Sequence, residues 1–320
     1  MGSITDIKGI KVGHASDFEA ITGCTVILFD KPALGSADLR GGGTSTRQID
    51  SLLSHNTFGK IHAVLFTGGS AYGLDASSGV MKYLEENDIG LHVGSGMFVP
   101  SVPTAVIFDV GIGDGKVRPD KQMGYRACLE AGAGSVEEGS VGAGTGATIG
   151  KLLGISRATK GGIGSGSCTL QSGVTVGVLT VVNAFGDIVS PENGEIIAGV
   201  RDSAEGSNFV GTVDLMKKGV VKEFEEALNT TLAVVATDAK LSKSELSRIS
   251  IIAQSALGRV ISPVHTAADG DLVISLSCGD LKADANAVGA VAAELLAEAI
   301  VRASQESLSL GGIPSPRDLK

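Results

Sequence analysis

Hydrophobic and polar positions follow one another along this chain in two ways, and each pattern predicts one kind of element. Short apolar runs bounded by glycine or polar residues predict buried strands. Segments whose apolar residues recur at helical spacing predict helices with one buried face. The predicted strands cover 24–29, 63–67, 105–110, 174–182, 232–236 and 272–277, and the predicted helices cover 45–53, 74–85, 125–131, 194–228, 242–260 and 285–303.

Glycine, serine and threonine concentrate over residues 139–166. Glycine permits tight turns and close backbone approaches, so this stretch predicts a site built from loops. The tail over 311–316 is predicted to be extended. Because neither an internal repeat nor a long linker divides the chain, the pattern predicts a single α/β layered domain over residues 1–320.

The composition excludes several classes of protein. With 43% hydrophobic and 19% charged residues, the 320-residue chain is too apolar for intrinsic disorder. Its 46 glycines lack a three-residue period, which excludes collagen. A net charge of -9 argues against a nucleic-acid or anionic-membrane surface, so a small molecule or another protein is the expected partner.

Cysteine spacing and the terminus predict the compartment. Cys24, Cys128, Cys168 and Cys278 lie far apart in the sequence and form neither a CxxC pair nor a dense disulfide framework. The first residues lack the basic and apolar regions of a signal peptide, and no apolar stretch is long enough to span a membrane. These observations predict a soluble, cytoplasmic protein.

The block GAGTGATIGK at 142–151 superficially suggests a phosphate site. It fails the P-loop pattern because Thr145 replaces the first glycine and Leu152 replaces the magnesium-binding hydroxyl. A loose GxGxxA match remains, but no clean strand precedes it. From these residues alone, a tight loop that leaves Lys151 in solvent is an equal alternative to a functional site.

Metal and serine-hydrolase signatures are missing from the sequence. The five histidines form no HExxH motif, so we expect neither a metal nor a cofactor. Asp269 and Asp271 could bind a hard cation, but the run lacks the further oxygen ligands of a calcium loop, so a polar turn that enters a strand is the favoured interpretation. The segment Gly68–Tyr72 has tyrosine where a nucleophile elbow needs its second glycine, which argues against an α/β-hydrolase.

The most informative position is the junction Asn229-Thr230-Thr231. A glycosylation acceptor or an ordinary helix end would explain it, but a hydroxyl residue here opens a predicted buried strand. If the peptide bond 229–230 were cut, Thr230 would carry a hydroxyl nucleophile and an α-amine base on one residue. The amine, with a pKa near 8, could accept the hydroxyl proton directly or through water.

A developing oxyanion would also need hydrogen-bond donors. Asn183 closes the predicted strand 174–182 and could direct its side-chain amide into a cleft. The alternative is that this amide only satisfies the backbone of a turn.

Several blocks in one order resemble the L-aminopeptidase/D-esterase family, which includes β-peptidyl aminopeptidases and nylon-oligomer hydrolases. The resemblance implies a four-layer αββα sandwich of the ornithine acetyltransferase type, similar to N-terminal-nucleophile hydrolases. It also implies self-cleavage into fragments 1–229 and 230–320. The blocks are VGH at 12–14, DLRGGG at 38–43, TGGSAYGLD at 67–75, RPD at 118–120, GAGTGATIGK at 142–151, VVNAFGD at 181–187, NTTLAVVATD at 229–238 and HTAADGD at 265–271.

The resemblance also implies roles for individual residues. Thr230 is the expected processing and catalytic nucleophile, with the cleaved bond after Asn229. Lys151 is expected beside it, where its charge would lower the pKa of the α-amine. Asn183 is expected to stabilise the oxyanion or position the nucleophile, and Asp269 and Asp271 are expected to anchor the lysine and the new N-terminus.

Two positions depart from parts of the family. Some relatives use serine as nucleophile, whereas this chain resembles the Asn-Thr branch. Some relatives carry a tyrosine at the place of Phe108, which would here provide a wall of the substrate pocket without a hydroxyl.

We therefore predict a cofactor-independent amidohydrolase that removes N-terminal residues from small peptides, amides or esters through an acyl-enzyme. The resemblance implies a homo-oligomer, a tetramer. One alternative is an acyltransferase of the ornithine acetyltransferase type, which passes the acyl group to an amine. The other is a non-catalytic scaffold or binding protein that stays uncut. Neither the substrate side chain nor the choice between α- and β-amino acids can be read from the residues.

Overall fold

The computed structural model describes residues 2–57, 59–221 and 229–319. Within them, a nine-stranded sheet is organised around one long strand, β2 (Thr22–Leu39). The first part of β2 pairs with β1 (Ile10–Asp17) and β4 (Lys60–Thr67), while its last part pairs with β16 (Leu272–Leu281). Because β2 pairs with β1 and β4 at one end and with β16 at the other, one continuous sheet forms two layers.

The strands divide between these two layers as follows. One layer contains β10, β11, β14 and β16, in which only β14 and β16 run parallel. The other contains β1, the start of β2, β4, β7 and β3. The bounds not yet given are β10 (Gly162–Thr169), β11 (Thr175–Asn183), β14 (Thr230–Ala239), β7 (Thr104–Val106) and β3 (Thr46–Arg47).

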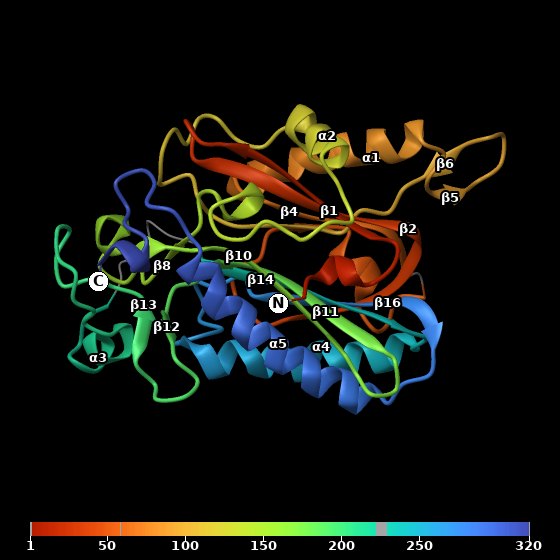
Figure 1. Cartoon of the computed structure of the whole chain (residues 1–320). Helices are drawn as coiled ribbons and strands as arrows, with labels where there is room; N and C mark the ends of the chain where they lie inside the picture. The colour runs from red at the N-terminus through yellow and green to blue at the C-terminus, as the bar shows by residue number, and fades with distance from the viewer. Residues whose placement is uncertain (1, 58, 222–228, 320) are drawn as a thin grey trace.

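Helices cover the two outer faces of the sheet (Figure 1). The long helices α4 (Lys243–Val260) and α5 (Ala285–Gln305) pack on the first layer, and α1 (Ala76–Glu86) and α2 (Lys121–Leu129) pack on the second. Three apolar cores separate the four layers: one under each helix pair and one between the sheet layers. This arrangement confirms the predicted αββα sandwich.

Short elements complete the described chain. None of the described helices combines the length and apolarity that crossing a bilayer requires. The short elements are β5 (Leu91–His92), β6 (Phe98–Val99), β8 (Thr148–Ile149), β9 (Thr159–Lys160), β12 (Asp187–Val189), β13 (Ile196–Ala198), α3 (Thr212–Lys217) and β15 (Ile261–Ser262).

The helices α4 and α5 form where the sequence predicts them. Helix α4 begins with a capping box, in which Ser242 accepts the N–H of Glu245 and the Glu245 side chain returns to the Ser242 N–H. Helix α5 is rich in alanine, which lets it approach its neighbours closely. A Cβ at Gly289 would lie 2.9 Å from the Cδ1 atom of Ile252 and 3.2 Å from its Cβ, so a larger residue there would require Ile252 to shift.

Two predicted helices are wrong. The segment 45–53 forms β3 and a short 3-10 turn, Ile49–Leu52, instead of an α-helix. In 194–228, the described part up to 221 holds β13 and the short α3, and residues 222–228 lie outside the described residues. Glycines with positive φ, at 194, 211 and 219, interrupt any continuous helix in that segment.

The glycine-rich stretch 139–166 contains the start of a strand that the sequence did not predict. This strand, β10, pairs with β11 over its whole length. Glycine replaces apolar residues in β10 because α5 crosses it closely. A Cβ at Gly164 would lie 2.0 Å from the carbonyl oxygen of Ala299. The usual apolar signal of a strand is therefore missing.

Candidate active site

Thr230 is the first residue of β14, and Asn183, the last residue of β11, lies directly opposite it. Both residues are buried. Side chains alternate along a strand, and Leu232 and Val234 contribute to the core between the two sheet layers. Thr230 therefore faces the interior between the layers.

The carbonyl of Asn229 receives two hydrogen bonds at this strand end. The hydroxyl of Thr230 donates to it over 2.5 Å, and the N–H of Gly270 donates to it over 2.7 Å. A nucleophilic oxygen therefore lies beside the carbonyl that precedes it. The Gly270 N–H is already in place for negative charge that develops on the carbonyl oxygen.

Gly270 is a candidate site residue that the sequence analysis did not name. A Cβ at this position would lie 2.9 Å from Thr230 Oγ1 and 3.1 Å from the carbonyl oxygen of Gly43. A side chain at 270 would therefore displace the hydroxyl or the neighbouring backbone. The available signal was a glycine between two aspartates, which by itself is equally typical of a surface turn.

The Asn183 amide is oriented by partners on both sides. Its Oδ1 accepts from Lys151 Nζ over 2.8 Å and from the Thr148 N–H over 3.0 Å. Its Nδ2 donates to the carbonyl oxygen of Phe108 over 3.2 Å. These contacts assign the amide oxygen to the lysine side, and the second Nδ2 hydrogen can serve a reacting group.

Lys151 is buried, and its Nζ also donates to the carbonyl oxygen of Asn183 over 3.1 Å. The alternative that leaves this lysine in solvent is therefore wrong. The structure brings Lys151 and Asn183 together, and Asn183 is the strand partner of Thr230. For Phe108, the side chain is half-buried, and the contact that reaches the site is made by its backbone carbonyl.

A buried carboxylate holds the segment that carries the Phe108 carbonyl. Asp109 accepts the Gly69 N–H over 2.6 Å and the Thr22 hydroxyl over 2.7 Å. Burial raises the pKa of Asp109 to about 6, although these hydrogen bonds and the charge of Lys160 lower it. Asp109 thus fixes the backbone next to the residue that orients Asn183.

Asp269 and Asp271 both organise backbone around the strand end. Asp271 Oδ1 accepts the Thr231 N–H over 2.7 Å, and its Oδ2 accepts from the imidazole of His265 over 2.8 Å. Asp269 Oδ2 accepts from the backbone and the hydroxyl of Thr266, over 2.9 and 2.6 Å. No group of three or more His, Cys, Asp or Glu among the described residues is arranged to hold a metal ion.

Asp269 should make the stability of the protein pH-dependent. Burial, and secondly the charge of Asp271, raise the pKa of Asp269 from 3.8 to about 6. Between these values the folded state binds more protons than the unfolded chain, so stability falls as the pH rises through that range. The contribution is at most about 3 kcal/mol, from 1.36 kcal/mol per pKa unit.

Replacing Asp269 with asparagine should remove this contribution. We expect the free energy of unfolding of the wild type, relative to that of Asp269→Asn, to rise as the pH falls from 6 to 4. Denaturant titrations of both proteins across this range measure the difference. Equal pH profiles would contradict a raised pKa at this position.

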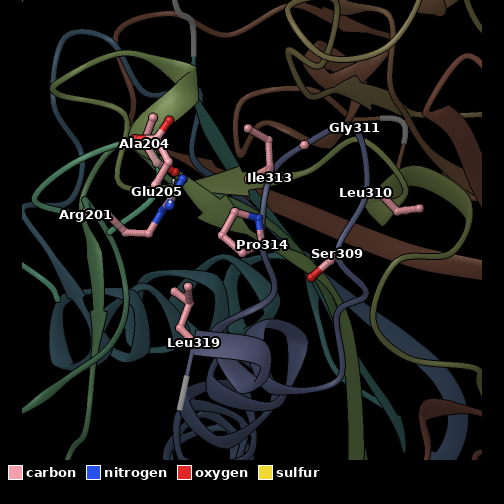
Figure 2. Close-up of a pocket in the computed structure, with 10 residues that line it drawn as sticks. Arg201, Ala204, Glu205, Ser309, Leu310, Gly311, Ile313, Pro314 and Leu319 are labelled. Carbon is pink, nitrogen blue, oxygen red and sulfur yellow. Dashed lines mark hydrogen bonds between the residues drawn. The ribbon is translucent and has the colours of Figure 1, made fainter. Parts of the chain in front are cut away.

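A separate cavity of about 400 Å³ lies beneath the C-terminal segment (Figure 2). None of the candidate site residues lines it. Its wall includes Arg201, whose guanidinium donates to the carbonyl oxygens of Ala158, Ala204, Gly206 and Ser156. Arg201 is thus occupied by backbone and serves as an anchor for the surrounding loops.

Loss of this anchor should destabilise the fold. Arg201→Met would leave these carbonyls without their donor, and we expect about 2–3 kcal/mol lower free energy of unfolding. Chemical denaturation measures the change. Arg248→Met, at an exposed position on α4, is the control and should stay within about 0.5 kcal/mol of wild type. Similar values for the two variants would refute the anchoring role.

Comparison with known proteins identifies relatives that cover most of the chain. The chain is 39% identical to an uncharacterized aminopeptidase of Mycobacterium tuberculosis, covering 100% of this chain and 98% of that protein. It is 31% identical to a 6-aminohexanoate-oligomer endohydrolase of Agromyces, covering 94% of this chain and 85% of that protein.

Solved structures share the fold. The L-aminopeptidase D-Ala-esterase/amidase of Ochrobactrum anthropi, described as a variant of the Ntn-hydrolase fold, matches with a TM-score of 0.75 at 19% identity. The match covers 98% of this chain and 88% of that one. A β-aminopeptidase of Burkholderia matches with a TM-score of 0.70 at 22% identity, over 99% of this chain and 92% of that one.

The family description is the most direct finding, because peptidase family S58 matches residues 2–313. Together with the relatives, it identifies the activity as hydrolysis of peptide or amide bonds. The chain belongs to peptidase family S58.

Proposed function

We propose that the chain cleaves its own 229–230 peptide bond and then acts as an aminopeptidase with Thr230 as the N-terminal nucleophile. The observation that carries the proposal is the contact of the Thr230 hydroxyl with the Asn229 carbonyl oxygen, 2.5 Å long. The Gly270 N–H on the same oxygen supports it further. A hydroxyl and an oxyanion donor on one carbonyl are what an acyl shift requires.

Self-cleavage would proceed in two steps, an acyl shift and the hydrolysis of an ester. Thr230 Oγ1 attacks the carbonyl carbon of Asn229 and loses its proton, and the C–N bond breaks as the Thr230 nitrogen takes up a proton. The product is an ester between Asn229 and the Thr230 side chain. The Thr230 α-amine is free from this point. Water then hydrolyses the ester, which releases the Asn229 carboxylate and restores the Thr230 hydroxyl.

In the mature enzyme the Thr230 α-amine would take the proton of Oγ1 as the hydroxyl attacks a substrate. Lys151 would lower the pKa of this amine by its charge, and Asn183 would donate its second Nδ2 hydrogen to the substrate oxyanion. Asp269 and Asp271 would hold the loop and strand around the new terminus. Phe108 would provide a pocket wall.

The substrates would be small peptides, amides or esters with a free N-terminal residue. The 6-aminohexanoate-oligomer endohydrolase among the relatives supports an amide bond as the target. A cytoplasmic homo-oligomer, a tetramer, completes the proposal. The acyltransferase and scaffold alternatives gain no support from the peptidase family or from the relatives.

Intact mass of the purified wild-type chain under denaturing conditions tests the proposal. We expect fragments 1–229 and 230–320, the second beginning with Thr230, and aminopeptidase activity that rises with the cleaved fraction. A full-length chain that hydrolyses aminoacyl amides would overturn the terminal nucleophile. Release of the acyl group mainly onto an added amine would favour the acyltransferase alternative.

A further inference from the structure

His265 has a backbone conformation that side chains rarely adopt. Its φ is +56°, in the left-handed region, where residues other than glycine are strained. The residue lies in the loop between β15 and β16, and its side chain is 23% exposed. Neither the sequence analysis nor the proposed mechanism gives it a role.

Two donors of His265 meet one oxygen of Asp271. The backbone N–H donates to Oδ2 over 3.2 Å, and the ring Nδ1 lies 2.8 Å from the same oxygen. An ionised carboxylate only accepts hydrogen bonds, so Nδ1 carries the hydrogen and donates. Two contacts to one oxygen restrict rotation of the carboxylate and direct Oδ1 to the Thr231 N–H, 2.7 Å away.

We infer that His265 is a positioning residue that fixes the Asp271 carboxylate, which in turn holds the backbone that carries the Thr230 nucleophile. This inference rests on the proposed function. The strained backbone is consistent with it, because strain persists where surrounding contacts require the conformation. The imidazole acts through Asp271 and touches no reacting atom.

Self-cleavage should change how strongly the position of Thr230 depends on the contact between His265 and Asp271. In the uncut chain the strand end is also held through Asn229, whose N–H donates to Ala268 and whose carbonyl accepts from Gly270. After cleavage these bonds would connect Asn229 of the large fragment to the loop of the small fragment, and they would no longer hold Thr230. The residue that follows the nucleophile, Thr231, then still donates its N–H to the Asp271 carboxylate. Turnover should therefore depend on His265 more than self-cleavage does.

Three substitutions separate the backbone from the imidazole. Glycine tolerates the positive φ but has no side-chain donor. Alanine neither tolerates the positive φ nor carries a donor. Asparagine tolerates positive φ better than most residues, and its amide can donate to Asp271 in place of Nδ1. A donor role therefore requires His265→Asn to retain activity that His265→Gly loses.

For the fully cleaved proteins we expect kcat on an aminoacyl amide to fall at least about tenfold in His265→Gly and His265→Ala, with KM within about twofold. His265→Asn should remain within about threefold of wild type. The rate of self-cleavage, measured by intact mass over time, should stay within about threefold of wild type for all three variants. Thermal unfolding of each variant checks that the fold is retained.

Asp88 provides a matched control, since it has the same φ of +56° at an exposed position after α1. Asp88→Ala and Asp88→Gly should keep kcat unchanged. Full kcat in His265→Gly, or a loss in His265→Asn equal to that in His265→Ala, would overturn the inference. A wild-type chain that never cleaves would instead overturn the proposed function, so the two failures are distinguishable.

Discussion

Replacing Thr230 with alanine will leave the chain at full length and remove its hydrolytic activity. Without Oγ1 no ester can form at Asn229, so no α-amine is released to act as the base. Because nucleophile and base are lost together, we expect kcat to fall by at least about 10⁴-fold. Denaturing intact mass and turnover of an aminoacyl amide measure the two effects.

Two companion variants show whether the hydroxyl itself is responsible. Thr230→Ser keeps the oxygen and should still cleave, with kcat within about tenfold of wild type. Thr237→Val alters a buried threonine of the same strand, whose hydroxyl donates to the Thr175 carbonyl, and should cleave completely. Cleavage of Thr230→Ala at the wild-type rate would rule out Oγ1 as the processing nucleophile.

Gly270→Ala will slow self-cleavage by about 10²–10³-fold. The new Cβ would lie 2.9 Å from Thr230 Oγ1, so either the hydroxyl or the Gly270 N–H must move away from the Asn229 carbonyl. Misplacing one oxyanion donor has an effect of this size in other acyl-transfer enzymes. The rate constant comes from intact mass measured over time after purification.

Gly258→Ala is the matched control for this substitution. Gly258 lies on α4, and a Cβ there would meet nothing within 4 Å. Alanine in a helix is more favourable than glycine by about 1 kcal/mol, so this variant should be slightly more stable and cleave at the wild-type rate. If Gly270→Ala also cleaved at that rate, the space and the donor at 270 would not be needed.

The structure brings together residues that the sequence analysis named separately. Lys151, from the glycine-rich block, donates hydrogen bonds to Asn183, which lies at the end of a strand opposite Thr230. The motif order indicated that these residues belong to one family site. It did not indicate that Asn183 would bind Lys151 with its oxygen and Phe108 with its nitrogen. Those contacts depend on three segments that are distant in sequence.

Gly270 and His265 were missed for the same reason. Glycine between two aspartates and histidine before a loop are common in turns, so neither residue type indicates a role. The proposed role of His265 depends on its contact with Asp271. That of Gly270 depends on the parallel alignment of 229 with 269, which places the Gly270 N–H on the Asn229 carbonyl. This alignment joins positions 40 residues apart and has no local sequence signal.

The sequence by itself determined the elements with a strong local signal. Helix α4, with its capping box and regular apolar face, and the buried β14 were predictable because the periodicity of apolar residues acts within a few positions. The Asn-Thr junction at the start of β14 and the family blocks were equally local. The predicted helix over 45–53 was wrong because propensity there is weaker than strand pairing with β7.

Only the tertiary structure decided what surrounds the Asn229 carbonyl and the nucleophile. The length of β2 makes one sheet into two layers, and strand pairing then places Asn183, Gly270 and Asp271 around one strand end. The physical reason is that a hydrogen bond requires donor and acceptor within about 3 Å. Local patterns predict which faces are buried, but only the register of distant strands can place atoms at that distance.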